Sequence, residues 1–226
     1  MNIKTLLLPL LAVSTMSLLG ADPMTPIETA KYTEPVKVAC VGDSITQGAG
    51  SGIPYPKQLQ TLLGEKWNVG NFGVSGRTLM DKGDFPYMSE KTYQSALAMK
   101  PDVVIIMLGT NDTKVQNWNF KDTFVADYTK LVASFQSLES KPLIYVCRPC
   151  PVPGNGGYGI NEAGIQEQIP LVDKLAKDMG LGVMDMHAAL EATPELLPDH
   201  VHPNTLGSGK MAEAAFTALT GKKAGQ

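Results

Sequence analysis

The chain has 226 residues, and its 19 basic and 22 acidic side chains give a formal net charge of −3. A charge this close to neutral provides no electrostatic basis for nucleic-acid binding, and small or neutral substrates fit better. The three cysteines are fewer than a disulfide framework needs, which argues against a small disulfide-stapled domain.

The first residues have the layout of a secretory signal peptide. Lys4 precedes an almost wholly apolar stretch over residues 6–19, and the small residues Gly20 and Ala21 follow it. Cleavage after Ala21 would make residues 1–21 the signal peptide of a secreted or periplasmic protein. The apolar stretch is too short to span a bilayer comfortably, so an uncleaved anchor is the less favoured alternative. We expect no stable membrane insertion after cleavage.

The rest of the chain has the pattern of one α/β domain. Residues 22–35 hold several prolines and are expected to form an extended lead-in. Over residues 36–226, strand-like and helix-like segments alternate, which predicts a parallel sheet with helices on both faces. A five-stranded, flavodoxin-like sheet in the order 2-1-3-4-5 would bring the carboxyl ends of its strands together around one site. The expected strands are 36–41, 67–71, 103–108, 143–147 and 182–186, and the expected helices are 56–63, 90–99, 122–138, 161–179 and 205–219.

Four short blocks of polar residues and glycines lie just after predicted strands or in loops. They are Gly-Asp-Ser-Ile-Thr at 42–46, Asn-Phe-Gly at 71–73, Gly-Thr-Asn-Asp at 109–112 and Asp-His-Val-His at 199–202. The first block follows a short, valine-rich buried strand, so we expect the Ser44 hydroxyl to be exposed at the carboxyl end of that strand. Open α/β sheets bind their ligands at this edge.

The first and last blocks together supply a nucleophile and its base. A serine hydroxyl is a poor nucleophile at neutral pH and needs a base within hydrogen-bond reach, itself held in the right tautomer by a third group. The Asp-x-x-His spacing allows one short turn to place the Asp199 carboxylate beside the His202 imidazole. The far ring nitrogen of His202 then remains free to face Ser44.

Attack on an ester carbonyl builds an oxyanion, which must be met by donors already in place. We expect three donors: the Ser44 amide, the Gly73 amide and the Asn111 side-chain amide. Glycine suits this position because the lack of a side chain lets substrate approach the backbone closely. Asparagine suits it because its amide donates without titrating.

At these residues the chain resembles the SGNH, or GDSL, hydrolase family, which is named for a serine, a glycine, an asparagine and a histidine. Ser44, Gly73, Asn111 and His202 match them in this order, with Asp199 at the family's triad aspartate. A lone Gly-Asp-Ser would be weak support because such tripeptides are common in turns, whereas four ordered blocks are specific. The resemblance covers nearly the whole chain after the first few dozen residues. It implies the three-layer α/β fold.

Four further residues near the blocks are candidates for binding substrate. Tyr55, Trp118 and Tyr158 are expected in loops, where exposed aromatic rings suit the faces of sugars, although ordinary packing is the alternative for each. Arg77 could bind a substrate carboxylate or could pair with a carboxylate of the fold.

The remaining cysteines and histidines have structural explanations. Cys40 is expected to be an inert packed thiol in the first strand. Cys147 and Cys150 have the Cys-x-x-Cys spacing, but zinc would want a second pair, so a local disulfide or two free thiols are expected. His187 is expected to be structural, and His200 follows Asp199 too closely to share the spacing of His202.

These features predict a serine carboxylic ester hydrolase that acts through an acyl-enzyme on Ser44, with no metal or organic cofactor. The chain resembles, more loosely, secreted family members that remove acetyl groups from carbohydrates, including sialic acid and xylan esterases. The expected substrate is therefore an acetylated carbohydrate. The alternatives are a small-acyl arylesterase or a lysophospholipase of the same fold, and a non-catalytic sugar-binding domain, which would have no use for a complete Ser, His and Asp set.

Overall fold

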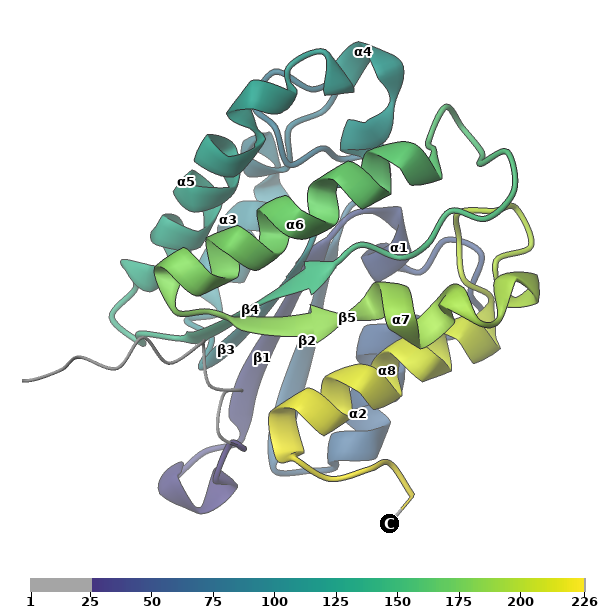
Figure 1. The fold of residues 1–226 in the computed structure, drawn as a ribbon. Coiled ribbons are helices and arrows are strands. Elements are labelled where there is room, and N and C mark those ends of the chain that lie inside the picture. Colours follow the sequence, from purple (N-terminus) through teal and green to yellow (C-terminus); the bar gives the residue numbers. More distant parts are fainter. Residues whose placement is uncertain (1–25, 226) are drawn as a thin grey trace, which may run out of the picture.

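The computed structural model describes residues 26–225, in which a five-stranded sheet lies between two layers of helices (Figure 1). All strands pair in parallel, in the order β2-β1-β3-β4-β5. This confirms the expected fold class and strand order. The strands are β1 (Val36–Gly42), β2 (Trp67–Gly73), β3 (Val103–Met107), β4 (Leu143–Arg148) and β5 (Gly182–Asp185). The expected signal peptide, residues 1–21, lies outside the described residues.

The five long helices fall where they were predicted, with ends that differ by one or two residues. Three short helices, α1, α4 and α7, were not predicted because one or two turns carry too little periodicity to be read. The α-helices are α1 (Ser44–Gln47), α2 (Tyr55–Leu63), α3 (Lys91–Ala98), α4 (Val115–Trp118), α5 (Phe124–Gln136), α6 (Glu162–Met179), α7 (Met186–Glu191) and α8 (Thr205–Thr220). The 3-10 turns are η1 (Thr29–Lys31), η2 (Tyr87–Ser89), η3 (Asn111–Thr113), η4 (Lys121–Thr123) and η5 (Pro194–Leu196).

Residues 26–35, the part of the expected lead-in that the structure describes, are less extended than expected. This segment contains the 3-10 turn η1, and the Ile27 amide donates to the Leu219 carbonyl at the end of α8, at 2.9 Å. Ile27 and Tyr32 are partly buried against the core. Apolar contacts of these two side chains therefore fold the segment back onto the domain despite its prolines.

The sheet separates two hydrophobic cores because successive strand side chains point to opposite faces. On the central strand β3, Val103, Ile105 and Met107 face one core, while Val104 and Ile106 face the other. Helices α2, α7 and α8 cover the first face, and α3, α5 and α6 cover the second. Burial on both faces explains why the central strand β3 reads as a continuous apolar run.

The carboxyl ends of β1 and β3 form the switch point of the sheet. After β1 the chain passes to the α2 face, and after β3 it passes to the α5 face, so the two loops part above neighbouring strands. Helix α1 lies at this edge in Figure 1. Within residues 26–225, none of the helices combines the length and apolarity needed to cross a membrane.

Candidate active site

Ser44 is the first residue of α1, directly beyond the end of β1. The Asp43 carboxylate caps this short helix by accepting from the Ile45 amide at 2.9 Å, which fixes the sharp turn from strand to helix. The position at the strand end is the expected one. The exposure is not, because Ser44 is only 6% exposed. The expectation of an open hydroxyl was wrong, since the neighbouring loops pack around the strand end.

Ser44, His202 and Asp199 form one chain of hydrogen bonds. Ser44 Oγ lies 2.9 Å from His202 Nε2, and His202 Nδ1 lies 2.7 Å from Asp199 Oδ2. The carboxylate accepts the hydrogen on Nδ1, which leaves Nε2 as the acceptor for the serine hydroxyl. The structure therefore brings Ser44 to an Asp199–His202 pair, with 158 positions of sequence between Ser44 and His202.

The backbone of the same turn holds the Asp199 carboxylate in its ionised form. Its second oxygen, Oδ1, accepts from the amides of Val201 at 3.1 Å and His202 at 2.7 Å. Burial alone would raise the pKa of Asp199, but these amides and the His202 ring lower it to about 2. The carboxylate is thus charged at neutral pH and opposite the imidazole.

The three expected oxyanion donors differ in what they bind. Within the described part of the chain, the Ser44 amide has no acceptor, whereas the Gly73 amide donates to Asn71 Oδ1 at 3.0 Å. Asn111 Nδ2 donates to the Arg77 carbonyl at 3.1 Å and to Asp43 Oδ2 at 3.3 Å. To bind at Gly73 and Asn111, an oxyanion would have to replace the acceptors to which these two groups now donate.

The structure gives a further reason for a glycine at position 73, besides the expected approach of substrate. A Cβ on Gly73 would lie 2.2 Å from the Gln47 nitrogen and 2.8 Å from the Asp43 carbonyl oxygen. A side chain here would therefore collide with the backbone of the segment that carries Ser44. Close packing of β2 against α1 requires the glycine, whatever the approach of a substrate.

Two carboxyl groups of the motif blocks, Asp43 and Asp112, are fully buried. Burial raises the pKa of Asp43 to about 6, against the opposing effects of the Ile45 amide and His202. Burial also raises the pKa of Asp112 to about 7, although its oxygens accept from the Met80 and Leu79 amides.

Two of the four candidate substrate-binding residues are used by the fold instead. Tyr55 is fully buried at the start of α2 within the first core, so its placement in an exposed loop was wrong. The helix begins one residue earlier than predicted and turns the ring inward. The Arg77 guanidinium forms an ion pair with Glu90 at 2.7 Å, which selects the second alternative, pairing within the fold.

The other two candidates, Trp118 and Tyr158, have different surroundings. Trp118 packs on the second core, with its Nε1 donating to Glu167 at 3.1 Å. It lines a hollow of about 390 Å³ beside α4 that includes no triad residue. Tyr158 is 67% exposed, and its hydroxyl donates to Asp199 Oδ2 at 3.2 Å. Of the four candidates, Tyr158 alone has a hydrogen bond to a triad residue.

Two residues that hold the site in place were missed by sequence reasoning. A Cβ on Gly50, whose φ is 77°, would lie 2.9 Å from His202 Cβ, so this glycine lets the histidine loop close onto the serine loop. Asn71 Nδ2 donates to the Thr46 carbonyl at 2.8 Å and so ties β2 to α1. The sequence signals that could have pointed to these two residues were the Gly-x-Gly at 48–50 and the asparagine preceding Phe72.

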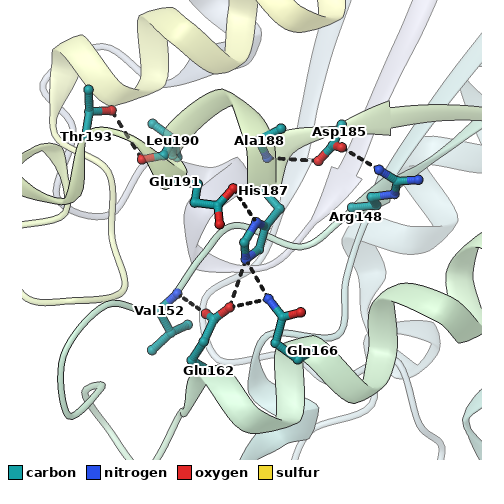
Figure 2. A network of polar contacts seen from close by, with 10 residues as sticks. All are labelled: Arg148, Val152, Glu162, Gln166, Asp185, His187, Ala188, Leu190, Glu191 and Thr193. Atoms are coloured by element: carbon teal, nitrogen blue, oxygen red, sulfur yellow. Dashed lines mark hydrogen bonds and ion pairs between the residues drawn. The ribbon is translucent and has the colours of Figure 1, made fainter.

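The rival histidines lie apart from Ser44. Figure 2 shows His187 of α7 beside Glu162 and Gln166 of α6, with Glu191 beyond its other nitrogen. His187 Nε2 lies 2.8 Å from Glu162 Oε1 and 3.2 Å from Gln166 Nε2, which agrees with a structural role. His200 is exposed with a φ of 67° and lies beside Gly154.

The three cysteines are free and buried. Burial raises the pKa of each thiol, so none has thiolate character at neutral pH. Cys147 and Cys150 are therefore two packed thiols, not a local disulfide. Within residues 26–225, no three His, Cys, Asp or Glu side chains gather into a group that could hold a metal ion.

Comparison with known proteins finds relatives that are esterases. The model of the GDSL-like lipase/acylhydrolase family matches residues 40–210. An acetylxylan esterase of Xylanibacter ruminicola is 38% identical over 84% of this chain and 44% of that protein. A multidomain esterase of Ruminococcus flavefaciens is 27% identical over 93% of this chain and 31% of that protein. The chain thus spans less than half the length of these two relatives.

The fold has solved counterparts. A catalytic mutant of an acetylxylan esterase from Geobacillus stearothermophilus superposes with a TM-score of 0.65 at 24% identity. The match covers 84% of this chain and 96% of that one. At this identity the likeness concerns the arrangement of the sheet and helices.

Proposed function

The chain belongs to the GDSL-like lipase/acylhydrolase family, and on this basis we propose that it hydrolyses carboxylic esters through an acyl-enzyme on Ser44. The observation that carries the proposal is the unbroken hydrogen-bond chain from Ser44 Oγ through His202 to Asp199. A hydroxyl, a neutral imidazole acceptor and an ionised carboxylate in this order are what nucleophilic acyl transfer needs.

In the first half of the reaction, Ser44 Oγ attacks the ester carbonyl carbon while its proton passes to His202 Nε2. The carbonyl π electrons move to oxygen, and the oxyanion accepts from the Ser44 amide, the Gly73 amide and Asn111 Nδ2. Asp199 stabilises the imidazolium that forms. When the tetrahedral species collapses, the C–O bond to the alcohol breaks and His202 returns its proton to that oxygen.

In the second half, water attacks the acyl carbon of the Ser44 ester with His202 again as the base. Collapse breaks the bond to Ser44 Oγ, which regains the proton from His202. A carboxylic acid leaves and ionises at neutral pH. The resting hydrogen bonds of Gly73 and Asn111 hold these donors in place before substrate arrives and are exchanged for bonds to the oxyanion.

We propose acetyl groups on carbohydrates as the substrate class. The similarity to an acetylxylan esterase supports this assignment. Ser44 is 6% exposed, which favours a small acyl group, and the exposed Tyr158 ring offers a face to a sugar. We further propose that the protein is secreted or periplasmic, on the basis of the signal-peptide pattern at residues 1–21.

Acetate release tests both the reaction and the substrate class. The panel would contain acetylated xylan, acetylated sialic acids and pectin fragments, with phenyl acetate and a lysophospholipid for the alternatives. We expect release from at least one carbohydrate and none from the Ser44→Ala variant. Hydrolysis of only the aryl ester or only the lysophospholipid would reject the carbohydrate assignment in favour of that alternative substrate. If the wild-type protein hydrolysed none of these esters, the assignment as an esterase would be rejected.

A further inference from the structure

The loop between β4 and α6 reaches the Asp199–His202 pair. Tyr158, near its tip, donates its hydroxyl to Asp199 Oδ2 at 3.2 Å. This is the same oxygen that binds His202 Nδ1. The ring centroid of Tyr158 lies 5.5 Å from that of His202, with an angle of 63° between the planes. One exposed side chain thus contacts both the carboxylate and the imidazole.

The backbone at Tyr158 adopts a conformation that a tyrosine seldom takes. The Ile160 amide donates to the Gly157 carbonyl at 2.8 Å, which closes a four-residue turn. The two central residues, Tyr158 and Gly159, have φ values of 57° and 79°. Positive φ is unfavourable for a residue with a bulky side chain, so the surrounding structure must hold this turn.

Apolar packing holds the loop against the segment that carries the histidine. Val152 and Ile160, at the two ends of the loop, form a third buried cluster with Ile165 and Val201. Val201 is the residue immediately before His202. A Cβ on Gly157 would lie 2.7 Å from the Asp199 carbonyl oxygen, so the loop backbone lies directly on the triad turn.

A polar network fastens the base of the same loop. Glu162, the first residue of α6, accepts from the Val152 amide at 2.6 Å through one oxygen. Its other oxygen lies 2.8 Å from His187 Nε2 and 2.7 Å from Gln166 Nε2. Figure 2 shows this arrangement, in which Glu162 links the start of the loop to α6 and α7. The carboxylate therefore ties together both ends of the segment that presents Tyr158.

We propose that Tyr158 is a positioning residue for the Asp199–His202 pair, held in place by the Glu162 network at the base of its loop. This inference rests on the proposed function. The hydroxyl shares Asp199 Oδ2 with the histidine and so weakens that oxygen as a base. The ring packs against the imidazole and limits its movement.

The two parts of Tyr158 have separable effects. Without the hydroxyl, Asp199 attracts the imidazolium more strongly, so the pKa of His202 rises in Tyr158→Phe. Asp199 itself stays in place because the Val201 and His202 amides hold its other oxygen. Without the ring, as in Tyr158→Ala, the imidazole can move more and is more exposed to water. We therefore expect kcat to fall.

The first experiment measures the titration of His202 by NMR of the imidazole carbons, without any substrate. The chain has three histidines, so His187→Gln and His200→Gln assign the signals. The ionisable groups that face His202 are Asp199, Tyr158 and Asp43, and burial raises the pKa of Asp43 to about 6. We expect Tyr158→Phe to raise the His202 midpoint by about 0.3 to 0.5 of a pH unit. An unchanged or lowered midpoint overturns the proposal.

The second experiment follows hydrolysis of 4-nitrophenyl acetate against pH. Tyr158→Phe should move the acid limb of the kcat/KM profile to higher pH by the same amount. Tyr158→Ala should lower kcat about three- to tenfold, and Phe should restore it. Equal kcat in the Ala variant and the wild type would reject the role of the ring. Because the NMR result needs no activity, it stands even where the proposed function fails.

The anchor is tested with a matched pair of glutamates on α6. Glu162→Ala should shift the His202 midpoint upward as Tyr158→Phe does, and the double variant should add nothing. Loss of a negative charge by itself would shift the midpoint downward. Glu167→Ala is the control, because Glu167 binds Lys121 and Trp118 away from the loop. Additive shifts, or equal shifts in both glutamate variants, would reject the anchor. If Glu162→Ala does not fold, the Tyr158→Phe titration decides the proposal.

Discussion

His202 and His187 are both covered from solvent and both lie beside a carboxylate, yet they are surrounded differently. His202 binds Asp199 at 2.7 Å through Nδ1 and faces the Ser44 hydroxyl at 2.9 Å through Nε2. His187 binds Glu162 at 2.8 Å through Nε2, where Gln166 also lies, and has Glu191 3.9 Å from Nδ1. A histidine with a carboxylate is therefore not by itself a catalytic pair. The group on the second nitrogen decides what the pair can do.

The surroundings of each histidine follow from its place on the sheet. The His202 turn meets the end of β1, where a strand-to-helix turn presents a hydroxyl. His187 lies on α7 against the first turn of α6, where the available partners are side chains that hold two helices and a loop together. We propose proton transfer as the role of His202. The contacts of His187 indicate that it holds α7 against α6.

The largest effect should come from removing the hydroxyl that distinguishes the two regions. We expect Ser44→Ala and His202→Ala each to lower kcat about 10⁴-fold, and the double variant to be little worse, because residues that act as one unit are not additive. Stopped-time assays of acetate release on folded, purified variants check this. A folded Ser44→Ala protein with a near-normal rate would contradict the assignment of the nucleophile.

The next effect concerns the proposed oxyanion donors, which have no counterpart beside His187. Asn111→Ala should lower kcat roughly 10² to 10³-fold with KM nearly unchanged, the usual cost of one oxyanion donor. Asn111→Asp should be worse, because a carboxylate cannot donate. The control is Asn117→Ala, since buried Asn117 donates to the Asn111 carbonyl at 2.9 Å. Lower melting temperature with unchanged kcat in Asn111→Ala would show that Asn111 acts only on stability.

The comparison predicts that the two histidines respond differently to the same substitution. His187→Gln should leave kcat within about threefold of the wild type and lower stability by about 1 kcal/mol, the scale of one hydrogen bond. His202→Gln should remove activity. Exposed His200 provides the neutral control. Equal losses of kcat in His187→Gln and His202→Gln, measured on folded protein, would break the distinction between the regions.

A further effect concerns the pH dependence of stability at Asp199. Its pKa of about 2 in the folded chain lies below the usual value of about 3.9 in an unfolded chain. Asp199 therefore stabilises the fold above about pH 4, and this contribution is lost as the pH falls towards 2. Urea unfolding of the wild type and Asp199→Asn at pH 7, 4 and 3 should show a stability difference that narrows at low pH. A constant difference would contradict the prediction.

The sequence by itself determined the sheet, its helices and the order of the four blocks. The elements depend on local properties: short apolar runs such as those of β1 and β3 mark strands, and helix-like segments alternate with them along the chain. The Asp199 and His202 pair was also predictable, because a spacing of three positions within one turn places the two side chains together. The short helix α1 was missed because four residues carry no period, although its first residue is Ser44.

Only the tertiary structure decided which side chains face the site. Tyr55 turned inward with the first turn of α2, Arg77 paired with Glu90, and Gly73 proved necessary for packing against α1. Tyr158 reached Asp199 across 41 positions of sequence. Such contacts depend on where whole elements dock and on how a loop is fastened at its base. No periodicity or spacing along the chain encodes them, because the partners become neighbours only when the sheet and its two helical layers are assembled.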